Sequence, residues 1–328
     1  MKINLLFLIG FLLYNVSTAQ VSIGSSVSPT NLYVSKIKDT EFDYLKKTKT
    51  YFVVPNELDF EKTKNLITSI WTFNPIEFIA QDDYNENDYI VENNTIIRIH
   101  DKNYSMTKTT IGKGSRTIGN WFVNKFELIS YPSVRIKKNG KKDPEIHQFA
   151  DVFFTQSILS RYKNHPSYRA KKAEEIGEEP DYYNFDYGYI KNYFQVLNDK
   201  LNKKEMLNVR DGIVNTKKLK ALKTQTLFVP DWILKTTNAF TGALGKIREP
   251  EELFEKYDFP YEMISYQALN DKILSGEKFY YLMHSQFNEY KLLSIIDSTT
   301  GEMIYLVENK GYNIDSGDIM DINKEIVD

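Results

Sequence analysis

The sequence predicts an α/β fold with mixed sheets, in which a helical connecting segment joins two related strand–helix–strand modules. Residues 49–55 are rich in β-branched and aromatic side chains, a helical pattern follows, and residues 75–79 form a second such run. Units of this order form parallel sheets with right-handed crossovers. A similar order begins again at residue 226, which indicates an internal duplication.

A chain of 328 residues exceeds the usual size of one domain, so two modules are expected. We expect a signal peptide over 1–19, a flexible lead over 20–40, an amino-terminal α/β module over 41–146, a helical or irregular connector over 147–215 and a carboxy-terminal α/β module over 216–328.

The amino terminus has the three parts of a secretory signal. Lys2 is the basic part, residues 5–13 are apolar, and the small residues Ser17 and Ala19 precede a cleavage site at Gln20. The apolar part is far shorter than the ~20 residues that span a bilayer. We therefore expect an exported protein, periplasmic or secreted, without a transmembrane segment after cleavage.

The first module begins with the strand at residues 49–55. Pro55 closes this strand, because proline cannot donate a hydrogen bond to a sheet ladder. Asp59 then suits the cap of a helix. The apolar residues of that helix share one face; they are Leu66, Ile67, Ile70 and Trp71.

Two antiparallel strands are expected next, because residues 95–110 alternate in polarity and residues 120–130 resume the strand pattern. Residues 112–115, Gly-Lys-Gly-Ser, form the turn between them. This stretch superficially suggests a phosphate-binding loop, but it lacks the upstream glycine of that motif and does not open a helix. We interpret it as a hairpin turn.

The connector contains two expected helices, over 147–162 and 189–206, with a charged, irregular stretch between them. Aromatic residues gather before the second helix, and four of them are candidate binding residues: Tyr182, Tyr183, Phe185 and Tyr187. Tyrosine offers a large contact area at low entropic cost, which is typical of binding surfaces. The alternative is that these rings pack the loop onto the helix.

The second module restates the first. Residues 51–58 align with 226–233, and residues 71–79 align with 257–264 when Asn74 is skipped. A helix is expected between the strands of this copy, over 251–257 after Pro250, a residue suited to a first helical turn. Further elements are expected as a helix over 267–274, a strand over 278–284, a hairpin of 290–297 with 302–307, and a helix over 319–326 capped by Asp318.

Five stretches of the carboxy-terminal half are distinctive, namely 226–230, 257–262, 279–282, 298–302 and 312–314. In these stretches the chain resembles a family of exported bacterial α/β proteins of uncharacterised function. The β-α-β-α-β order is also similar to the periplasmic modules of the curli secretion channel and of the Tol-system propeller protein. This fold-level resemblance implies envelope assembly or partner binding. Unlike the curli channel protein, the chain has no lipidated cysteine and no obvious membrane hairpins.

The composition excludes several function classes. Without cysteine the chain has no disulfide, thiolate nucleophile or zinc–thiolate site. With 42 basic and 44 acidic residues it has no excess positive charge to attract nucleic acid. We expect an envelope protein as partner, no nucleic acid and no cofactor.

Candidate metal and catalytic residues are few. The acidic loop 81–88 fails as a calcium loop, because Asp88 replaces the required glycine and Asn94 the required glutamate. The four histidines are scattered, so no metal site is expected. Glu77 and Glu262 occupy matching repeat positions, where they could act together as acid and base or simply face solvent.

The sequence thus predicts a non-enzymatic binding or scaffold protein of the bacterial cell envelope. The alternative is a hydrolase that uses paired carboxylates, with a weakly bound cation.

Overall fold

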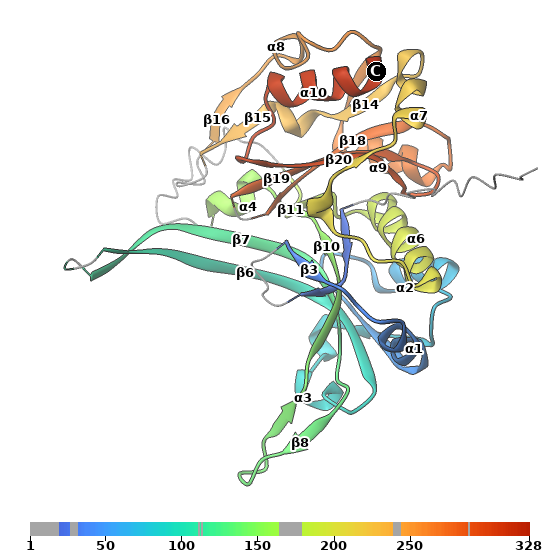
Figure 1. The fold of residues 1–328 in the computed structure, drawn as a ribbon, viewed down its shortest axis with the longest axis vertical. Coiled ribbons are helices and arrows are strands. Elements are labelled where there is room, and N and C mark those ends of the chain that lie inside the picture. Colours follow the sequence, from blue (N-terminus) through green and yellow to red (C-terminus); the bar gives the residue numbers. More distant parts are fainter. Residues whose placement is uncertain are drawn as a thin grey trace, which may run out of the picture.

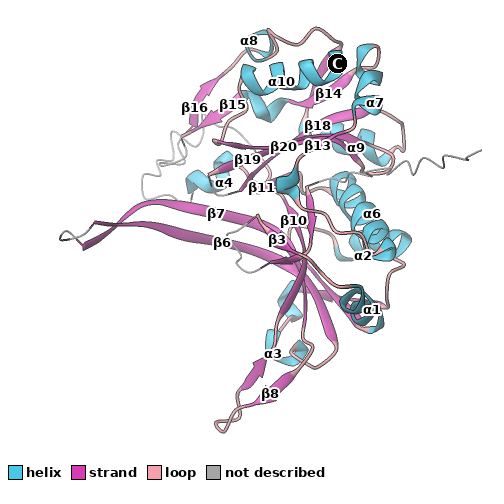
Figure 2. Cartoon of the chain, in the orientation of Figure 1, coloured by secondary structure: helices cyan, strands magenta, loops and turns pink. Residues whose placement is uncertain are grey.

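The computed structural model describes residues 20–26, 32–110, 112, 114–163, 179–238, 244–287 and 289–328. These residues fold into two six-stranded mixed sheets of similar topology, with helices packed against them (Figures 1 and 2). The predicted α/β class with two related modules is therefore confirmed. The predicted signal peptide lies outside the described residues, and so does His165, one of the four histidines considered as metal ligands.

The first sheet has the strand order β1-β10-β7-β6-β4-β5. β4 is parallel to its neighbours β5 and β6, and the other neighbouring pairs are antiparallel. The strands are β1 (Val21–Ile23), β4 (Lys49–Val54), β5 (Ile76–Ala80), β6 (Asn94–Thr110), β7 (Gly114–Ser130) and β10 (His147–Phe153).

The second sheet has the order β13-β20-β19-β18-β14-β17, in which β14 is parallel to β17 and β18. The strands are β13 (Ile213–Val214), β14 (Leu227–Pro230), β17 (Tyr261–Ile264), β18 (Tyr280–Phe287), β19 (Tyr290–Asp297) and β20 (Met303–Lys310). Each strand corresponds in position and direction to one in the first sheet. The duplication is therefore confirmed in topology, with β14 in the place of β4.

The copies differ most in the central hairpin. β6 and β7 have 17 residues each, whereas their counterparts β18 and β19 have 8 each. The extra length of β6 and β7 projects beyond the body of the protein (Figure 1).

The remaining strands form two-stranded ribbons, namely β2 (Ser25–Ser26) with β3 (Val34–Ser35), β8 (Val134–Ile136) with β9 (Lys142–Pro144), β11 (Thr155–Gln156) with β12 (Tyr182–Tyr183), and β15 (Lys235–Thr237) with β16 (Leu244–Ile247).

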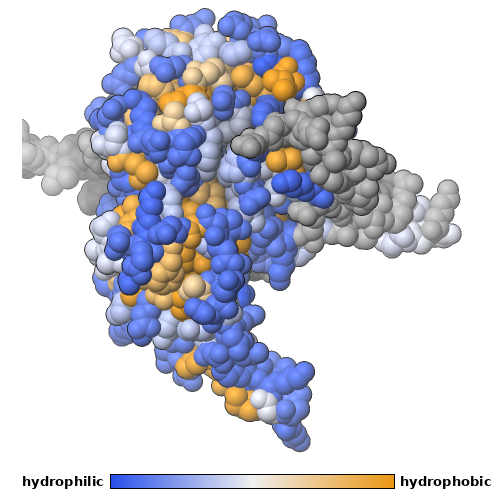
Figure 3. Space-filling model, turned by 180° about the vertical axis from the view of Figure 1, so that it is seen from behind, coloured by the Kyte–Doolittle hydropathy of each residue, from blue (hydrophilic) through white to orange (hydrophobic). Residues whose placement is uncertain are grey.

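The surface is largely hydrophilic, with scattered hydrophobic patches on the face seen in Figure 3. Ile136 of the projecting β8–β9 hairpin is 64% exposed.

The α-helices are α1 (Asp39–Lys47), α2 (Phe60–Ile70), α3 (Glu86–Tyr89), α4 (Ile158–Lys163), α6 (Tyr187–Lys203), α7 (Thr216–Leu219), α8 (Pro250–Leu253), α9 (Tyr266–Leu274) and α10 (Ser316–Val327). Short 3-10 turns are η1 (Gln81–Asp83), η2 (Val209–Asp211), η3 (Lys220–Lys223) and η4 (Asp231–Leu234). Among the described helices, none has both the length and the apolar character needed to cross a bilayer.

Two helix starts test the predicted caps. The Asp59 carboxylate accepts the Lys62 N–H at 2.7 Å, so the predicted cap of α2 is confirmed. In α10 the cap is Asp315, which accepts the N–H groups of Gly317 and Asp318 at 2.9 and 3.2 Å. The prediction of Asp318 as cap is therefore wrong. Asp318 instead accepts the Asp315 N–H at 2.8 Å, which completes a capping box.

Three sequence predictions need correction. Residues 147–153 form β10, a strand of the first sheet, so the helix predicted there is wrong; a short apolar run fits a buried strand or a helix equally well. The predicted flexible lead contains β1, which pairs with β10 and buries Val21 and Ile23 completely. The helix predicted over 251–257 is the single turn α8.

The two modules share one large hydrophobic core, in which α6 contacts α2 of the first module and α9 of the second. α8 and α10 lie in a separate core on the other face of the second sheet. Thus the helix after β4 faces the shared core, whereas its counterpart after β14 faces away from it. The copies have the same topology but turn opposite faces to the shared core.

Candidate functional site

A cavity of about 880 Å³ lies between segments of the two modules. The first module contributes Glu57 and Leu58, which follow β4. The second module contributes the turn after β14 and the start of α9, and the connector contributes a run before and into α6. These residues are Asp231, Trp232, Leu234, Lys235, Ile247, Ser265, Tyr266 and Gln267 from the second module, and Glu179, Pro180, Asp181, Tyr182, Tyr183, Phe185, Asp186 and Tyr187 from the connector.

The topology of the second sheet explains why an opening exists here. β14 and β17 are parallel neighbours, so their carboxyl ends meet at one edge. From that edge the chain continues from β14 toward α8 on one face and from β17 into α9 on the other. Chains that diverge to opposite faces leave a crevice beyond the strand ends, which is the usual ligand position in open α/β sheets.

The matching crevice of the first module is bridged by polar side chains. The Asn56 N–H donates to Gln81 Oε1 at 3.2 Å, and Asn56 Nδ2 donates to Asp82 Oδ1 at 2.8 Å. Both acceptors lie in η1, directly after β5. The two copies have therefore diverged at this edge, where hydrogen bonds cross between the strand ends in one and a cavity lies in the other.

The inner walls of the cavity are aromatic rings that are held rigidly by stacking. Tyr183 stacks on Trp232 with ring centroids 4.1 Å apart, and Trp232 stacks in turn on His284 at 5.3 Å. Tyr266 stacks on Tyr189, with ring centroids 5.4 Å apart. Trp232 lies between Tyr183 and His284, and Tyr266 lies against Tyr189, so these rings are held in place before a ligand binds.

Two tyrosine hydroxyls connect the walls to the first module. The Tyr182 hydroxyl donates to Asp101 Oδ2 at 2.5 Å, and burial raises the pKa of Tyr182. The Tyr187 hydroxyl accepts the Asp59 N–H at 2.8 Å. The Lys62 ammonium lies 3.7 Å from the centroid of the Tyr187 ring. The start of α6 is thereby fixed to the start of α2.

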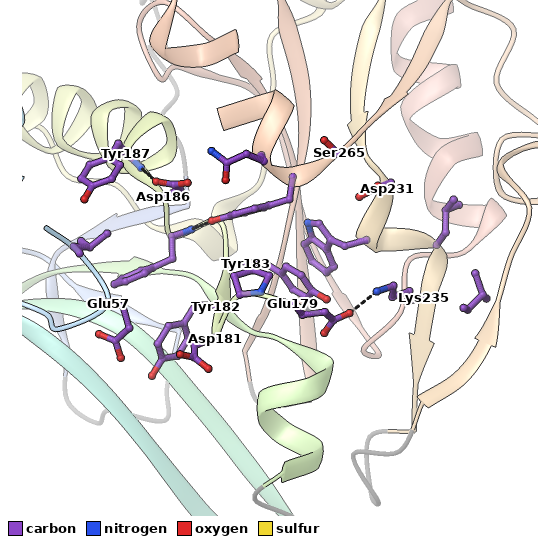
Figure 4. A pocket seen from close by; sticks show the side chains of 18 residues that line it. Glu57, Glu179, Asp181, Tyr182, Tyr183, Asp186, Tyr187, Asp231, Lys235 and Ser265 are labelled. Atoms are coloured by element: carbon purple, nitrogen blue, oxygen red, sulfur yellow. Dashed lines mark hydrogen bonds and ion pairs between the residues drawn. The ribbon is translucent and has the colours of Figure 1, made fainter. Parts of the chain in front are cut away.

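Carboxylates surround the aromatic walls (Figure 4). Glu57 and Asp181 lie close together on one side, and Asp231 lies on the opposite side. Partial burial raises the pKa of Glu57, and the negative charges of Asp181 and Asp101 raise it further. Burial also raises the pKa of Asp231. The cavity is thus a site of accumulated negative charge.

The cavity contains one described cationic side chain, Lys235, which is already paired. Its ammonium lies 2.6 Å from Glu179 Oε1. The second oxygen of Glu179 accepts the Leu159 N–H at 3.0 Å, and the Glu179 side chain is only 2% exposed. The pair joins the connector to the second module.

The four aromatic residues predicted as binding residues all line this cavity. Tyr182, Tyr183 and Phe185 are also almost fully buried, so the alternative packing role applies to them as well. Their contribution to binding stays a prediction.

Glu77 and Glu262 do not line this cavity. They lie on β5 and β17, edge strands of different sheets, and both are exposed. Glu77 pairs with Lys49 at 2.5 Å. Among the described residues, no group of three or more acidic or histidine side chains is arranged to hold a metal ion.

Four residues of the cavity were not predicted as site residues from the sequence: Glu57, Asp231, Trp232 and Tyr266. A signal for the first three was present, because residues 56–58 and 231–233 follow aligned strands of the repeat and lie at carboxyl strand ends.

Comparisons with protein-family models, curated proteins and solved structures gave no match.

Proposed function

We propose that the protein is an extracytoplasmic, non-enzymatic binding protein of the bacterial cell envelope, and that it binds its ligand or partner in the cavity between the modules. The observation that supports this function best is the cavity of about 880 Å³ with rigid aromatic walls. Ligand sites typically enclose ~300–1,000 Å³ and combine aromatic walls with a few polar groups.

The extracytoplasmic location rests on the sequence. The amino-terminal 19 residues have the pattern of a cleaved signal, and the chain lacks cysteine, which suits an oxidising compartment. A periplasmic or secreted protein of this kind agrees with the fold-level resemblance to periplasmic modules of envelope assemblies.

A hydrolase that uses Glu77 and Glu262 has less support. The two carboxylates lie on edge strands of different sheets, and neither lines the cavity. General acid–base catalysis requires both groups within reach of one substrate.

Blocking the cavity tests the proposed function. Gln267 is an exposed residue that lines the cavity in the first turn of α9, so Gln267→Trp places a large ring in part of the space without removing a buried contact. Gln225→Trp is the matched control, because Gln225 is exposed and does not line the cavity.

The purified proteins are immobilised, incubated with fractions of a bacterial envelope extract and washed, and the retained small molecules and proteins are identified by mass spectrometry. We expect a component that the wild type and Gln225→Trp retain and Gln267→Trp loses. Equal retention by all three proteins, or no retention by any, would contradict a binding role for the cavity.

A further inference from the structure

The chemical class of the ligand follows from the charges around the cavity. Glu57, Asp181 and Asp231 line it and form no ion pair within the described part of the chain. The cation Lys235 pairs with Glu179, and its charge also acts on Asp231, where it opposes the effect of burial on the pKa. Asp186 accepts the N–H of Tyr187 at the start of α6, where the helix dipole offsets its charge. Glu57 and Asp181 are thus left without a compensating cation.

The arrangement of these carboxylates favours a positively charged ligand. Glu57 lies within the electrostatic influence of Asp181 and Asp101, so like charges repel one another at one side of the cavity. Low-dielectric walls strengthen such a field and concentrate ions of the opposite sign. A bound cation would relieve this repulsion.

The aromatic walls favour the same ligand class. Ammonium and guanidinium groups bind over the faces of aromatic rings. One wall residue already shows this contact, since the Lys62 ammonium lies 3.7 Å from the centre of the Tyr187 ring. Tyr187, at the boundary of the cavity, therefore already binds an alkylammonium group, that of Lys62.

The size of the cavity distinguishes an organic cation from a metal ion. A bare metal ion would fill little of a volume of about 880 Å³.

We propose that the cavity binds an organic cation, an alkylammonium or guanidinium group on an apolar stem. This inference rests on the proposed function of the cavity. A free amine and a lysine or arginine side chain of an envelope protein both have this chemistry.

Matched probes test the charge requirement by isothermal titration calorimetry on the full mature chain. Acetyl-lysine methylamide and acetyl-norleucine methylamide differ mainly in the ammonium group. We expect the lysine compound to bind at least roughly tenfold more tightly at low salt, the factor that ~1.4 kcal/mol represents. Spermidine and an unstructured lysine-containing peptide then distinguish a free amine from a protein side chain as the source.

A double substitution tests the residues. Glu57→Gln with Asp181→Asn removes two charges from the cavity, and we expect affinity for the lysine compound to fall roughly fivefold to twentyfold at low salt, because each partly exposed charge contributes modestly. The control Asp88→Asn with Glu92→Gln changes the net charge equally at exposed positions that do not line the cavity. Thermal unfolding of both variants verifies that they fold.

The outcomes separate the two proposals. If the wild type retains an extract component that Gln267→Trp loses, but the lysine compound binds no better than the norleucine compound, the inferred ligand class is wrong and the binding function stands. An equal loss of affinity in the two charge variants would also refute the assignment of Glu57 and Asp181. If no extract component and no probe binds, both proposals fail.

Discussion

Gly188→Ala tests how closely α6 and α9 approach beside the cavity. A Cβ atom at residue 188 would lie 2.7 Å from the carbonyl oxygen of Asn270 and 3.0 Å from Cβ of Ile273. In addition, the Gly188 N–H donates to Asn270 Oδ1 at 2.7 Å in a buried position. Alanine therefore cannot enter unless α6 moves away from α9, because a backbone oxygen cannot rotate aside.

The size of the effect follows from opposing terms. Replacing glycine with alanine in a helix gains at most ~1 kcal/mol. Overpacking a well-packed site costs ~1–3 kcal/mol, and weakening a buried hydrogen bond costs a further ~1–2 kcal/mol. We expect the free energy of unfolding to fall by about 2 kcal/mol in total.

Urea unfolding followed by circular dichroism measures this change. Gly276→Ala is the control, because no atom lies within 4 Å of the added Cβ and only the positive φ of 80° opposes alanine; this strain costs ~1–2 kcal/mol. Since Tyr187 and Tyr266 lie at the starts of α6 and α9, Gly188→Ala should also weaken ligand retention, which Gly276→Ala should leave unchanged. A Gly188→Ala protein as stable as the wild type would refute the proposed close approach.

Three further predictions concern other parts of the chain. Asp59→Ala removes the cap of α2 and should lower the free energy of unfolding by ~1 kcal/mol in urea, whereas an unchanged value would contradict the capping role. Burial opposes ionisation of Glu127, but its hydrogen bond with His100 and the charge of Arg98 offset this and lower its pKa to about 2. Because folding lowers the pKa of Glu127 from its ordinary value of 4.5, the ionised side chain stabilises the fold at pH values above 4.5. About 3 kcal/mol of the free energy of unfolding should therefore be lost as the pH falls from 4.5 toward 2. Urea unfolding across this range should show a shallower pH dependence for Glu127→Gln, and identical slopes would rule out the effect. Mass spectrometry of exported protein should find an amino terminus at Gln20, and a retained segment 1–19 would disprove cleavage.

Much of the local structure was predictable because it depends on neighbouring residues. The runs that became β4 and β14 combine β-branched and aromatic residues and end at a proline, and Asp59 precedes a helical pattern. The misassigned strand β10 shows the limit of this reasoning. It pairs with β7 and with β1, which is distant in sequence, and its apolar side chains lie in the core that the two modules share, so local periodicity could not identify it.

The candidate site was predictable only in part. The aromatic run from Tyr182 to Tyr187 was recognisable as a binding candidate from composition alone. Its partners Glu57, Asp231 and Tyr266 lie in other elements, far along the chain. Their convergence depends on how the modules pack, which no local pattern encodes.

The sequence by itself determined the α/β class, the strand–helix–strand units and their duplication, because periodicity, proline positions and caps act over a few residues. Only the tertiary structure decided that the two copies turn opposite faces to one shared core. Strands buried on both faces have the same apolar pattern whichever face meets the partner. That choice of face places the carboxyl strand ends of both modules around the connector, and so creates the cavity.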